Sequence, residues 1–246
     1  MKKTLKNLLP KQLIYAYSNI KNKNKTTEEI FTQIYQKKYW GTSENGETYF
    51  SGSGSVNKGV DDYKKALKEF IKTKEITSVF EIGCGDFSIM KPVLEQSELN
   101  YIGADVVKDL INHLTSHHGN DRIKFMQMDA ITASDYPSAD LCIIRQVLQH
   151  LDNAQILEIL KKTNKFKFVI ITEHIPLYPE VKNADKSISG YIRLQNKKTS
   201  GVFLNEHPFL LNSNTLLSYR EDDADYNGKI IPALMLTSLI ENIAIE

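Results

Sequence analysis

Short runs of β-forming residues alternate with helical stretches between residues 78 and 172, and this alternation restricts the possible folds more than any other feature. The runs are SVFEI (78–82), NYIGA (100–104), IKFMQ (123–127), DLCII (140–144) and FKFVIIT (166–172). Helices are expected at about 89–96, 107–116 and 153–162. Alternating strands and helices are typical of a parallel sheet covered by helices, whose strands are apolar on both faces. The sequence therefore predicts an α/β fold with a doubly wound, mostly parallel sheet.

The segments on either side of this core have different patterns. Residues up to about Ile34 are expected to form a helical arm, and the polar, Gly- and Ser-rich residues 40–58 predict a cover loop. Apolar residues from Val60 to Ile71 recur at helical spacing. Near the other end, Asn227–Gly228 lies between two apolar runs, which predicts an antiparallel hairpin added to the sheet.

These patterns predict one main domain rather than two. Residues 1–59 would form the N-terminal helical arm and cover loop, and residues 60–246 a single domain. The rhythm of strands and helices stops after residue 175, so a substrate-cap insertion is expected at about 175–212.

Composition is that of an ordinary globular protein, with 41% hydrophobic residues, 25% charged residues and a net charge of +1. Cys84 and Cys142 do not form a spaced framework, which favours a reducing, cytoplasmic location and excludes a cysteine zinc cluster. No run resembles a signal peptide or a membrane span, and no H-E-x-x-H motif or spaced acid cluster indicates a metal. Nine lysines against Glu28 and Glu29 make residues 1–40 basic, as expected of a solvated helical face or of a segment that meets an anionic partner.

The segment VFEIGCGDF, residues 79–87, reads as a strand that runs into a glycine-rich turn. Gly83 and Gly85, on either side of Cys84, permit a sharp turn and the close approach of a ligand, because no Cβ blocks it. In a dinucleotide-binding fold this turn receives a pyrophosphate. Here Glu81 precedes the turn, and a carboxylate repels phosphate and attracts a positive group. The turn therefore favours a ligand that carries a positive charge.

Two further acids follow the next two predicted strands. Asp105 can accept hydrogen bonds from both ribose hydroxyls, as in nucleotide-binding α/β folds, and by itself would fit NAD as well. Asp129 can accept a hydrogen bond from the adenine amine, with Met128 and Ala130 in apolar contact with the ring. Because ligands of open α/β sheets bind at the carboxyl ends of the strands, Glu81 and these two acids are expected to surround one ligand.

On these residues, the region from about Val79 to Thr172 resembles the S-adenosylmethionine-dependent methyltransferases with the Rossmann-like fold. Glu81, Gly83 and Gly85 match the first motif of that family, with Phe87 in place of a frequent glycine, while Asp105 matches its ribose-binding acid and Asp129–Ala130 its adenine-binding pair. The segment DLCIIRQVLQHL is similar to the fourth strand and following helix of the family, which implies that Arg145 and Gln146 lie near the methyl group and that Gln149 and His150 begin a helix.

A second resemblance concerns the flanks. The WG…SGSGS stretch near the N-terminus and GVFLNEHPFLL late in the chain are similar to a subgroup of bacterial small-molecule methyltransferases associated with cell-surface sugar pathways. It implies that Trp40 and residues Ser51 to Ser55 close over the cofactor. The residues expected to bind S-adenosylmethionine are Glu81, Gly83, Cys84, Gly85, Asp105, Val106, Met128, Asp129, Ala130, Arg145, Gln146, Trp40 and Ser53.

Methyl transfer from a sulfonium needs alignment of the nucleophile and exclusion of water, and an oxygen acceptor also benefits from a general base. The candidate catalytic residues are His150, after the fourth strand, and Glu173 with His174, at the end of the fifth. The candidate substrate-binding residues Tyr191, Arg193 and His207 lie in the irregular segment that follows.

The leading hypothesis is a methyltransferase for a small-molecule acceptor, with O-methylation favoured over N-methylation and a place in cell-surface polysaccharide synthesis. A nucleic-acid methyltransferase is the rival within the fold. It is disfavoured because the fourth strand ends in IIRQ and no basic patch interleaved with aromatics extends through the core. A non-catalytic nucleotide-binding protein and a nicotinamide-dependent dehydrogenase remain as alternatives, the latter opposed by the missing glycine pattern.

Overall fold

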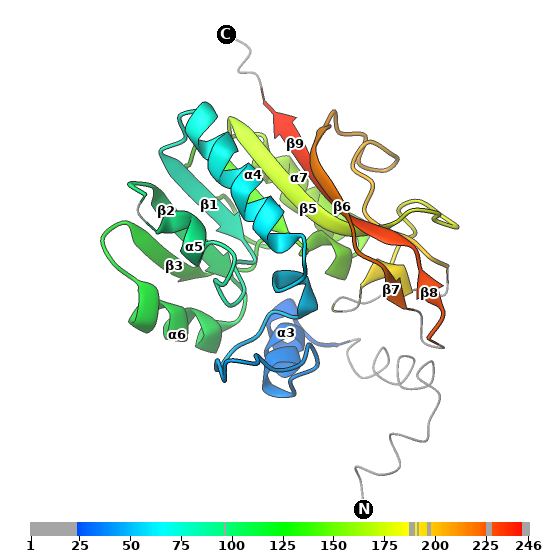
Figure 1. Ribbon diagram of the computed structural model, residues 1–246, viewed down its shortest axis with the longest axis horizontal. Helices are drawn as coiled ribbons and strands as arrows, with labels where there is room; N and C mark the ends of the chain where they lie inside the picture. The colour runs from blue at the N-terminus through cyan, green and yellow to red at the C-terminus, as the bar shows by residue number, and fades with distance from the viewer. Residues whose placement is uncertain are drawn as a thin grey trace, which may run out of the picture.

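The computed structural model describes residues 24–95, 97–186, 190, 192–195, 198–224 and 228–242. Its centre is a seven-stranded sheet in the order β3-β2-β1-β4-β5-β9-β6 (Figure 1). The elements in chain order are α3 (Thr27–Gln36), α4 (Val60–Thr73), β1 (Ser78–Ile82), α5 (Lys91–Leu94), β2 (Asn100–Asp105), α6 (Lys108–His118), β3 (Ile123–Gln127), β4 (Leu141–Arg145), α7 (Asn153–Thr163), β5 (Phe168–Pro176), β6 (Asn214–Arg220), β7 (Asp223–Ala224), β8 (Ile230–Ile231) and β9 (Ala233–Glu241). Short 3₁₀ helices are η1 (Ser53–Ser55), η2 (Leu148–His150) and η3 (Arg193–Gln195).

The first five strands of the sheet are parallel, and β9 runs antiparallel to both β5 and β6. This arrangement confirms the predicted Rossmann-like α/β fold with its antiparallel hairpin. The two hairpin strands continue into the short β7–β8 pair, and residues 225–227, including the predicted turn residue Asn227, lie outside the described residues.

Helices cover both faces of the sheet because alternate residues of each strand face opposite sides. Leu141 and Ile143 of β4 pack in the cluster that includes α4, α5 and α6, whereas Cys142 and Ile144 pack in the cluster that includes α7. In Figure 1, α4 and α5 lie in front of the sheet and α7 lies behind it. The continuous apolar run LCII is thus explained by burial on both faces.

Some boundaries differ from the sequence-based expectation. The helix expected at 89–96 is only the single turn α5, and Gln149 and His150 belong to η2 rather than to the helix that follows. That helix, α7, begins after Asp152, whose side chain accepts a hydrogen bond from the Gln155 backbone while the Gln155 side chain accepts one from the Asp152 backbone. The fifth strand continues to Pro176 and so includes Glu173 and His174, because β9 pairs with its whole length.

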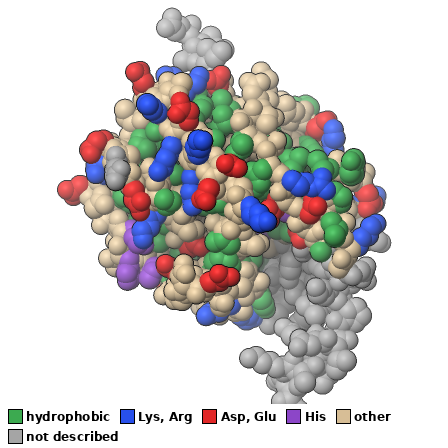
Figure 2. Space-filling model, in the orientation of Figure 1, with side chains coloured by type: hydrophobic (Ala, Val, Ile, Leu, Met, Phe, Trp, Pro, Cys, Tyr) green, Lys and Arg blue, Asp and Glu red, His purple; other side chains and the backbone are tan. Residues whose placement is uncertain are grey.

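The N-terminal part of the described chain lies across the carboxyl ends of the parallel strands (Figure 1). It consists of α3, which begins with a capping box between Thr26 and Glu29, and of an irregular segment that contains η1. On the face that Figure 2 shows, basic and acidic side chains are intermixed. Among the described helices, none is long and apolar enough to cross a membrane.

Candidate active site

A cavity of about 780 Å³ lies at the carboxyl ends of the parallel strands, between the sheet and the N-terminal cover. We define the cover as α3 together with residues 39–57. All thirteen residues expected to bind the cofactor line this cavity. So do two of the three candidate catalytic residues, His150 and His174, whereas Glu173 does not. The three acids at the ends of β1, β2 and β3 therefore surround one space, as the sequence predicts.

The turn after β1 requires glycine at two positions. Gly83 and Gly85 have φ values of +71° and +55°, in the left-handed region that favours glycine. A Cβ on Gly83 would lie 2.3 Å from a methyl carbon of Val147, and one on Gly85 would lie 2.4 Å from Ser51 Oγ. Phe87, at the position where the family often has glycine, also has a left-handed φ of +65°. Its ring packs against Tyr101 and Phe125, at centroid distances of 5.4 and 5.0 Å.

Glu81 is a buried carboxyl group at the floor of the cavity. It accepts a hydrogen bond from the Tyr101 hydroxyl. Burial raises the pKa of Glu81 to about 8, although the Tyr101 hydrogen bond and the charge of Arg145 act in the opposite direction. At neutral pH the group is therefore mostly protonated until a positive charge comes near it.

Asp105 ends β2 beside the glycine-rich turn. Its Oδ1 accepts from the Val107 N–H at 3.0 Å and its Oδ2 from the Gly85 N–H at 3.3 Å. Burial raises the pKa of Asp105 to about 6, while these backbone hydrogen bonds lower it. Two backbone donors leave lone pairs on both oxygens available for further donors.

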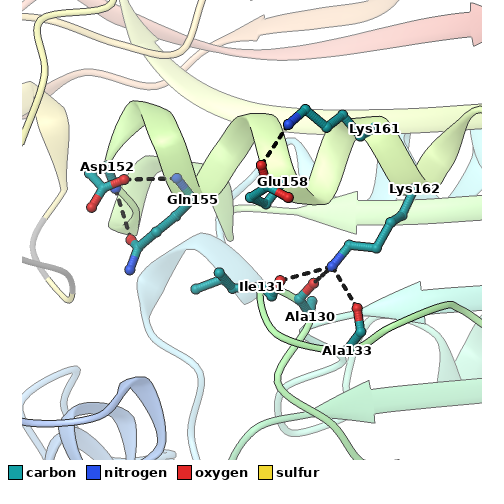
Figure 3. A network of polar contacts seen from close by, with 8 residues as sticks. All are labelled: Ala130, Ile131, Ala133, Asp152, Gln155, Glu158, Lys161 and Lys162. Carbon is teal, nitrogen blue, oxygen red and sulfur yellow. Dashed lines mark hydrogen bonds and ion pairs between the residues drawn. The ribbon is translucent and has the colours of Figure 1, made fainter.

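The loop after β3 is fixed from two sides. Met128 N donates to the Asp105 carbonyl at 2.9 Å, and Ile131 N donates to Asp129 Oδ1 at 2.9 Å. Figure 3 shows the Lys162 ammonium of α7 reaching three carbonyls of this loop, those of Ala130, Ile131 and Ala133, at 2.8, 2.8 and 2.9 Å. The loop carrying Met128, Asp129 and Ala130 is thus held by a helix that lies far from it in the sequence.

Arg145 and Gln146, at the end of β4, contact the cover. The Arg145 guanidinium lies 5.0 Å from the ring centroid of Tyr63, and its Nη2 donates to the Gly54 carbonyl at 2.9 Å. Gln146 has a left-handed φ of +56°, which is uncommon for a residue with a side chain. Its amide lies so close to Gly54 that a Cβ on this glycine would be 2.2 Å from Gln146 Nε2.

His150 forms part of an aromatic wall with the cover. Its ring lies 5.7 Å from Phe31 and 5.6 Å from Trp40, centroid to centroid. Burial, followed by the nearby charge of Lys186, lowers the pKa of His150 to about 3, so the ring is neutral at physiological pH. Its Nδ1 is buried without a hydrogen-bond partner in the described part of the chain.

Glu173 and His174 are neighbours in β5 but have different surroundings. The Glu173 carboxylate is buried and accepts from the backbone N–H groups of Leu148 and Gln149, at 2.9 and 3.0 Å, so it holds η2 in place. His174 faces the cavity, and its Nε2 lies 2.6 Å from the Glu221 carbonyl oxygen. A carbonyl only accepts, so Nε2 carries the proton and Nδ1 of the neutral ring is an acceptor.

The residues expected to bind substrate do not gather at the cavity. Arg193 is fully buried and donates to the Leu151 and Ala184 carbonyls at 2.6 and 2.9 Å, so it joins the segment after β5 to the end of η2. Neither Arg193 nor His207 lines the cavity, and Tyr191 lies outside the described residues. The part of the cavity beyond β4 is lined instead by His174, Met235 and the acids Glu221, Asp222 and Asp223. The acidic run beside the predicted hairpin was the one sequence signal for these residues.

The cover is attached to the glycine-rich turn by a pair of reciprocal hydrogen bonds. Ser51 N donates to Asp86 Oδ2 at 2.6 Å, and Asp86 N donates to Ser51 Oγ at 2.7 Å. The Tyr35 hydroxyl of α3 lies 3.0 Å from the same Ser51 Oγ. We call these contacts the Ser51 clasp. Within the described residues, no group of three or more His, Cys, Asp or Glu side chains is positioned to hold a metal ion.

Comparison with known proteins agrees with this geometry. Residues 80–165 match the family described as a methyltransferase domain. The N-methyltransferase NodS from Bradyrhizobium japonicum WM9, solved with S-adenosyl-L-homocysteine, is 10% identical, with a TM-score of 0.53 over 78% of this chain and 96% of NodS. The N-terminal domain of EvdMO1 with S-adenosyl-L-homocysteine bound is 9% identical, with a TM-score of 0.52 over 82% of this chain and 85% of that domain. No curated protein matches the chain in sequence.

The sheet order, the glycine-rich turn and the acids at three successive strand ends define a Rossmann-like site for a nucleotide cofactor. With the family match, they identify the class more closely. Residues 80–165 match a methyltransferase domain, the kind that uses S-adenosylmethionine, and the fold is that of two proteins solved with S-adenosyl-L-homocysteine.

Proposed function

We propose that the protein transfers the methyl group of S-adenosylmethionine to a hydroxyl oxygen of a small molecule. One observation carries this proposal: the cavity lined by Glu81, Asp105 and Asp129 also extends past the end of β4 to His174. Its volume of about 780 Å³ is within the range of about 300–1,000 Å³ usual for small-molecule sites. The space beyond β4 would receive the acceptor.

The residues around the turn fit the cofactor. Asp105 retains lone pairs on both oxygens for the two ribose hydroxyls, and Glu81 would lose its proton to face the ammonium group. Asp129 would accept from the adenine amine, between Met128 and Ala130. Trp40 and Ser53 would cover the cofactor from the opposite side.

When bound, the cofactor supplies a methyl group that its sulfonium already activates. The protein's own contribution would be alignment, exclusion of water and removal of a proton. His174 Nδ1 would take the proton of the acceptor hydroxyl, because the Glu221 carbonyl fixes the tautomer. Glu173 would act as a positioning residue that holds η2, and the neutral His150 ring would form part of the wall.

N-methylation is the second candidate, and the acids Glu221, Asp222 and Asp223 favour it because carboxylates attract an ammonium group.

Sugar nucleotides are the first acceptors to test, given the resemblance to enzymes of cell-surface sugar pathways. We further propose that residues 1–59 are the arm and cover, and that the segment between β5 and β6 is the substrate cap. A cavity enclosed by a cover favours a small molecule over a nucleic acid.

The first experiment tests the cofactor. S-adenosylhomocysteine should raise the melting temperature and NAD should not. A ligand at 100 times its dissociation constant adds about 2.7 kcal/mol to the free energy of unfolding. Asp105→Ala should weaken binding of S-adenosylhomocysteine tenfold or more, while the exposed Asp121→Ala serves as control. Stabilisation by NAD alone, or unchanged binding by Asp105→Ala, would contradict the assignment.

The second part of the test concerns the reaction. Labelled methyl transfer is measured with sugar nucleotides and phosphorylated metabolites as acceptors. His174→Gln should bind S-adenosylhomocysteine normally and lose about 100-fold in kcat, a usual contribution of a general base. His207→Gln, outside the cavity, should keep its activity. Full activity of His174→Gln toward a hydroxyl acceptor would remove its role as base.

A further inference from the structure

Arg145 is a buried positive charge at the junction of the two parts of the cavity. The residue is only 9% exposed, and it lines the cavity between the ends of β1, β2 and β3, where the three acids lie, and the strand that carries His174. Among the described residues no carboxylate lies within ion-pair distance of it. Burial of an unpaired charge is costly, so a counter-ion is expected.

The orientation of the guanidinium is fixed by its surroundings. The Tyr63 ring packs against it, and its Nη2 donates to the Gly54 carbonyl at 2.9 Å and to the Tyr219 hydroxyl at 3.5 Å. Its Nε is buried without a hydrogen-bond partner in the described part of the chain. A guanidinium held in this way keeps unused donors in a defined direction, which suits an anion with two oxygens.

Asn57 supplies a second unused donor, its amide nitrogen. The directions of two hydrogen bonds show which atom of the amide is the nitrogen. Arg145 can only donate, so the Tyr219 hydroxyl accepts from it and donates its own hydrogen bond to Asn57 Oδ1 at 3.2 Å. The amide nitrogen of Asn57 is therefore left as a donor, and it too is buried without a partner in the described residues.

Gln146 supplies a third unused donor. Its Oε1 accepts from Gln149 Nε2 at 3.5 Å, which leaves Gln146 Nε2 as a donor that is buried and unpartnered in the described part of the chain. Three side chains, one just after η1 and two at the end of β4, thus offer unused N–H groups. The carboxylates at the far end of the cavity, on residues 221–223, belong to the hairpin instead. A surplus of donors beside an unpaired cation is the chemistry of an anion site.

We propose that Asn57, Arg145 and Gln146 form a subsite for an anionic group, a carboxylate or a phosphate, of a ligand of the methyltransferase site. The inference rests on the proposed function. Two sources share this chemistry: the carboxylate of the cofactor's amino-acid portion and an anionic group of the acceptor. The subsite would hold that group beside the point at which the methyl group is transferred. It would thereby fix the orientation of the ligand that carries the group.

The test compares Arg145→Met with wild type for three probes measured by calorimetry: S-adenosylhomocysteine, 5′-methylthioadenosine, and inorganic phosphate added to protein saturated with S-adenosylhomocysteine. Methylthioadenosine keeps the nucleoside and thioether but lacks the amino-acid group. A loss of tenfold or more for S-adenosylhomocysteine, with methylthioadenosine changed less than twofold, assigns the subsite to the cofactor carboxylate. Loss of phosphate binding alone assigns it to the acceptor.

Asn57→Ala and Arg145→Lys complete the test. Asn57→Ala should weaken binding of the probe that Arg145→Met affects by about tenfold to 150-fold, as loss of one hydrogen bond to a charged group predicts. Arg145→Lys should retain part of the binding, which keeps the proposal falsifiable if Arg145→Met does not fold. The exposed Arg122→Met is the control.

Three results would overturn the subsite. The first is unchanged binding of all three probes by Arg145→Met, and the second is an equal loss for S-adenosylhomocysteine and methylthioadenosine. The third is failure of wild type to bind phosphate while Arg145→Met binds S-adenosylhomocysteine normally. Failure of the proposed function gives a different pattern, in which wild type binds neither nucleoside probe. In that case phosphate, offered to the protein alone, should still bind wild type and not Arg145→Met, and equal binding would overturn the subsite as well.

Discussion

Glu81 shows how burial prepares a carboxyl group for a cationic ligand. The pKa of about 8 means that the group holds a proton in the free protein at neutral pH. The groups that face it are the Tyr101 hydroxyl, Arg145, Asp105 and Asp86, and only the first two favour the charged form. A bound ammonium would add a third such influence and release the proton. Without the cofactor, the protonated Glu81 carries no buried negative charge. With the cofactor bound, the charge of Glu81 would be balanced by the ammonium group.

A dependence of stability on pH follows from this residue. In the unfolded chain Glu81 loses its proton near its ordinary pKa of 4.5, whereas the folded protein keeps it up to about 8. The folded state thus binds more protons between these values, and the free energy of unfolding falls as pH rises through this window, by at most about 1.4 kcal/mol per pH unit. Urea unfolding at pH 5 to 8 should show a shallower decline for Glu81→Gln than for wild type.

Some decline should persist in Glu81→Gln, because burial also raises the pKa of Asp105 to about 6 and that of Glu173 to about 7. The exposed Glu98→Gln is the control, since its side chain is 94% exposed. Parallel pH profiles for wild type and Glu81→Gln would show that Glu81 titrates normally in the folded protein.

At the residue level the sequence was sufficient to place the three acids around one cavity, but it did not place the residues expected to meet the acceptor. Glu81, Asp105 and Asp129 could be predicted because each follows a recognisable strand, and parallel strands end at one edge. Arg193 was predicted to meet substrate, but its guanidinium is taken up by the Leu151 and Ala184 carbonyls. Which groups the Arg193 guanidinium binds depends on which carbonyls the folded loops leave without a partner. A local sequence pattern contains no information about this.

Among the elements, the helix of the cover buries few apolar residues. The buried residues of α3 are Ile30 and Ile34, and the segment after it meets the turn through the Ser51 clasp. The central strands β1, β4 and β5 are instead buried on both faces. An element with few buried apolar residues opens at a lower free energy than the core. We therefore expect the cover to open and close around the cofactor while the sheet stays intact.

The clasp can be weakened by one substitution. Ser51→Ala removes the acceptor of Asp86 N and the contact with Tyr35, but leaves the Ser51 N–H bond to Asp86. At about 1 kcal/mol for each lost hydrogen bond, S-adenosylhomocysteine should dissociate about fivefold to thirtyfold faster. Trp40, the only tryptophan in the chain, lines the cavity and reports the rate by stopped-flow fluorescence. Ser43→Ala, in the cover but outside the clasp, is the matched control, and equal dissociation rates for both variants would contradict a role for the clasp.

Elements were predicted well where the pattern is local. All five parallel strands and the hairpin lie where the apolar runs indicate, and the runs of β1, β4 and β5 are buried on both faces. The expected helix at 89–96 is shorter: it begins at Lys91, with Pro92 in its first turn, and ends after Leu94. The extension of β5 to Pro176 depends on pairing with β9, a strand far along the chain, and a local pattern contains no information about that partner.

For the whole molecule, the fold separates the sheet with its helices from a cover that we expect to close over the cavity. The sheet and its helices form the floor, and the N-terminal cover forms the roof of the same cavity. Hydrogen exchange measured with and without S-adenosylhomocysteine should therefore show slower exchange in residues 27–36 and 51–58. The amides of β4 and β5, already protected by the sheet, should change little. Equal protection throughout the chain would indicate global stabilisation rather than closure.

The contacts that anchor α3 also have a consequence for the order of assembly. Glu28 accepts from Gln127, Phe31 meets the ring of His150, and Ile30 packs close to Gly190. The earliest described helix to leave the ribosome thus finds its partners only after most of the polypeptide has been made, and contacts so distant in sequence form late. A nascent chain would possess the glycine-rich turn well before it possessed a roof, so competence to retain the nucleoside would arise as one of the final events of maturation.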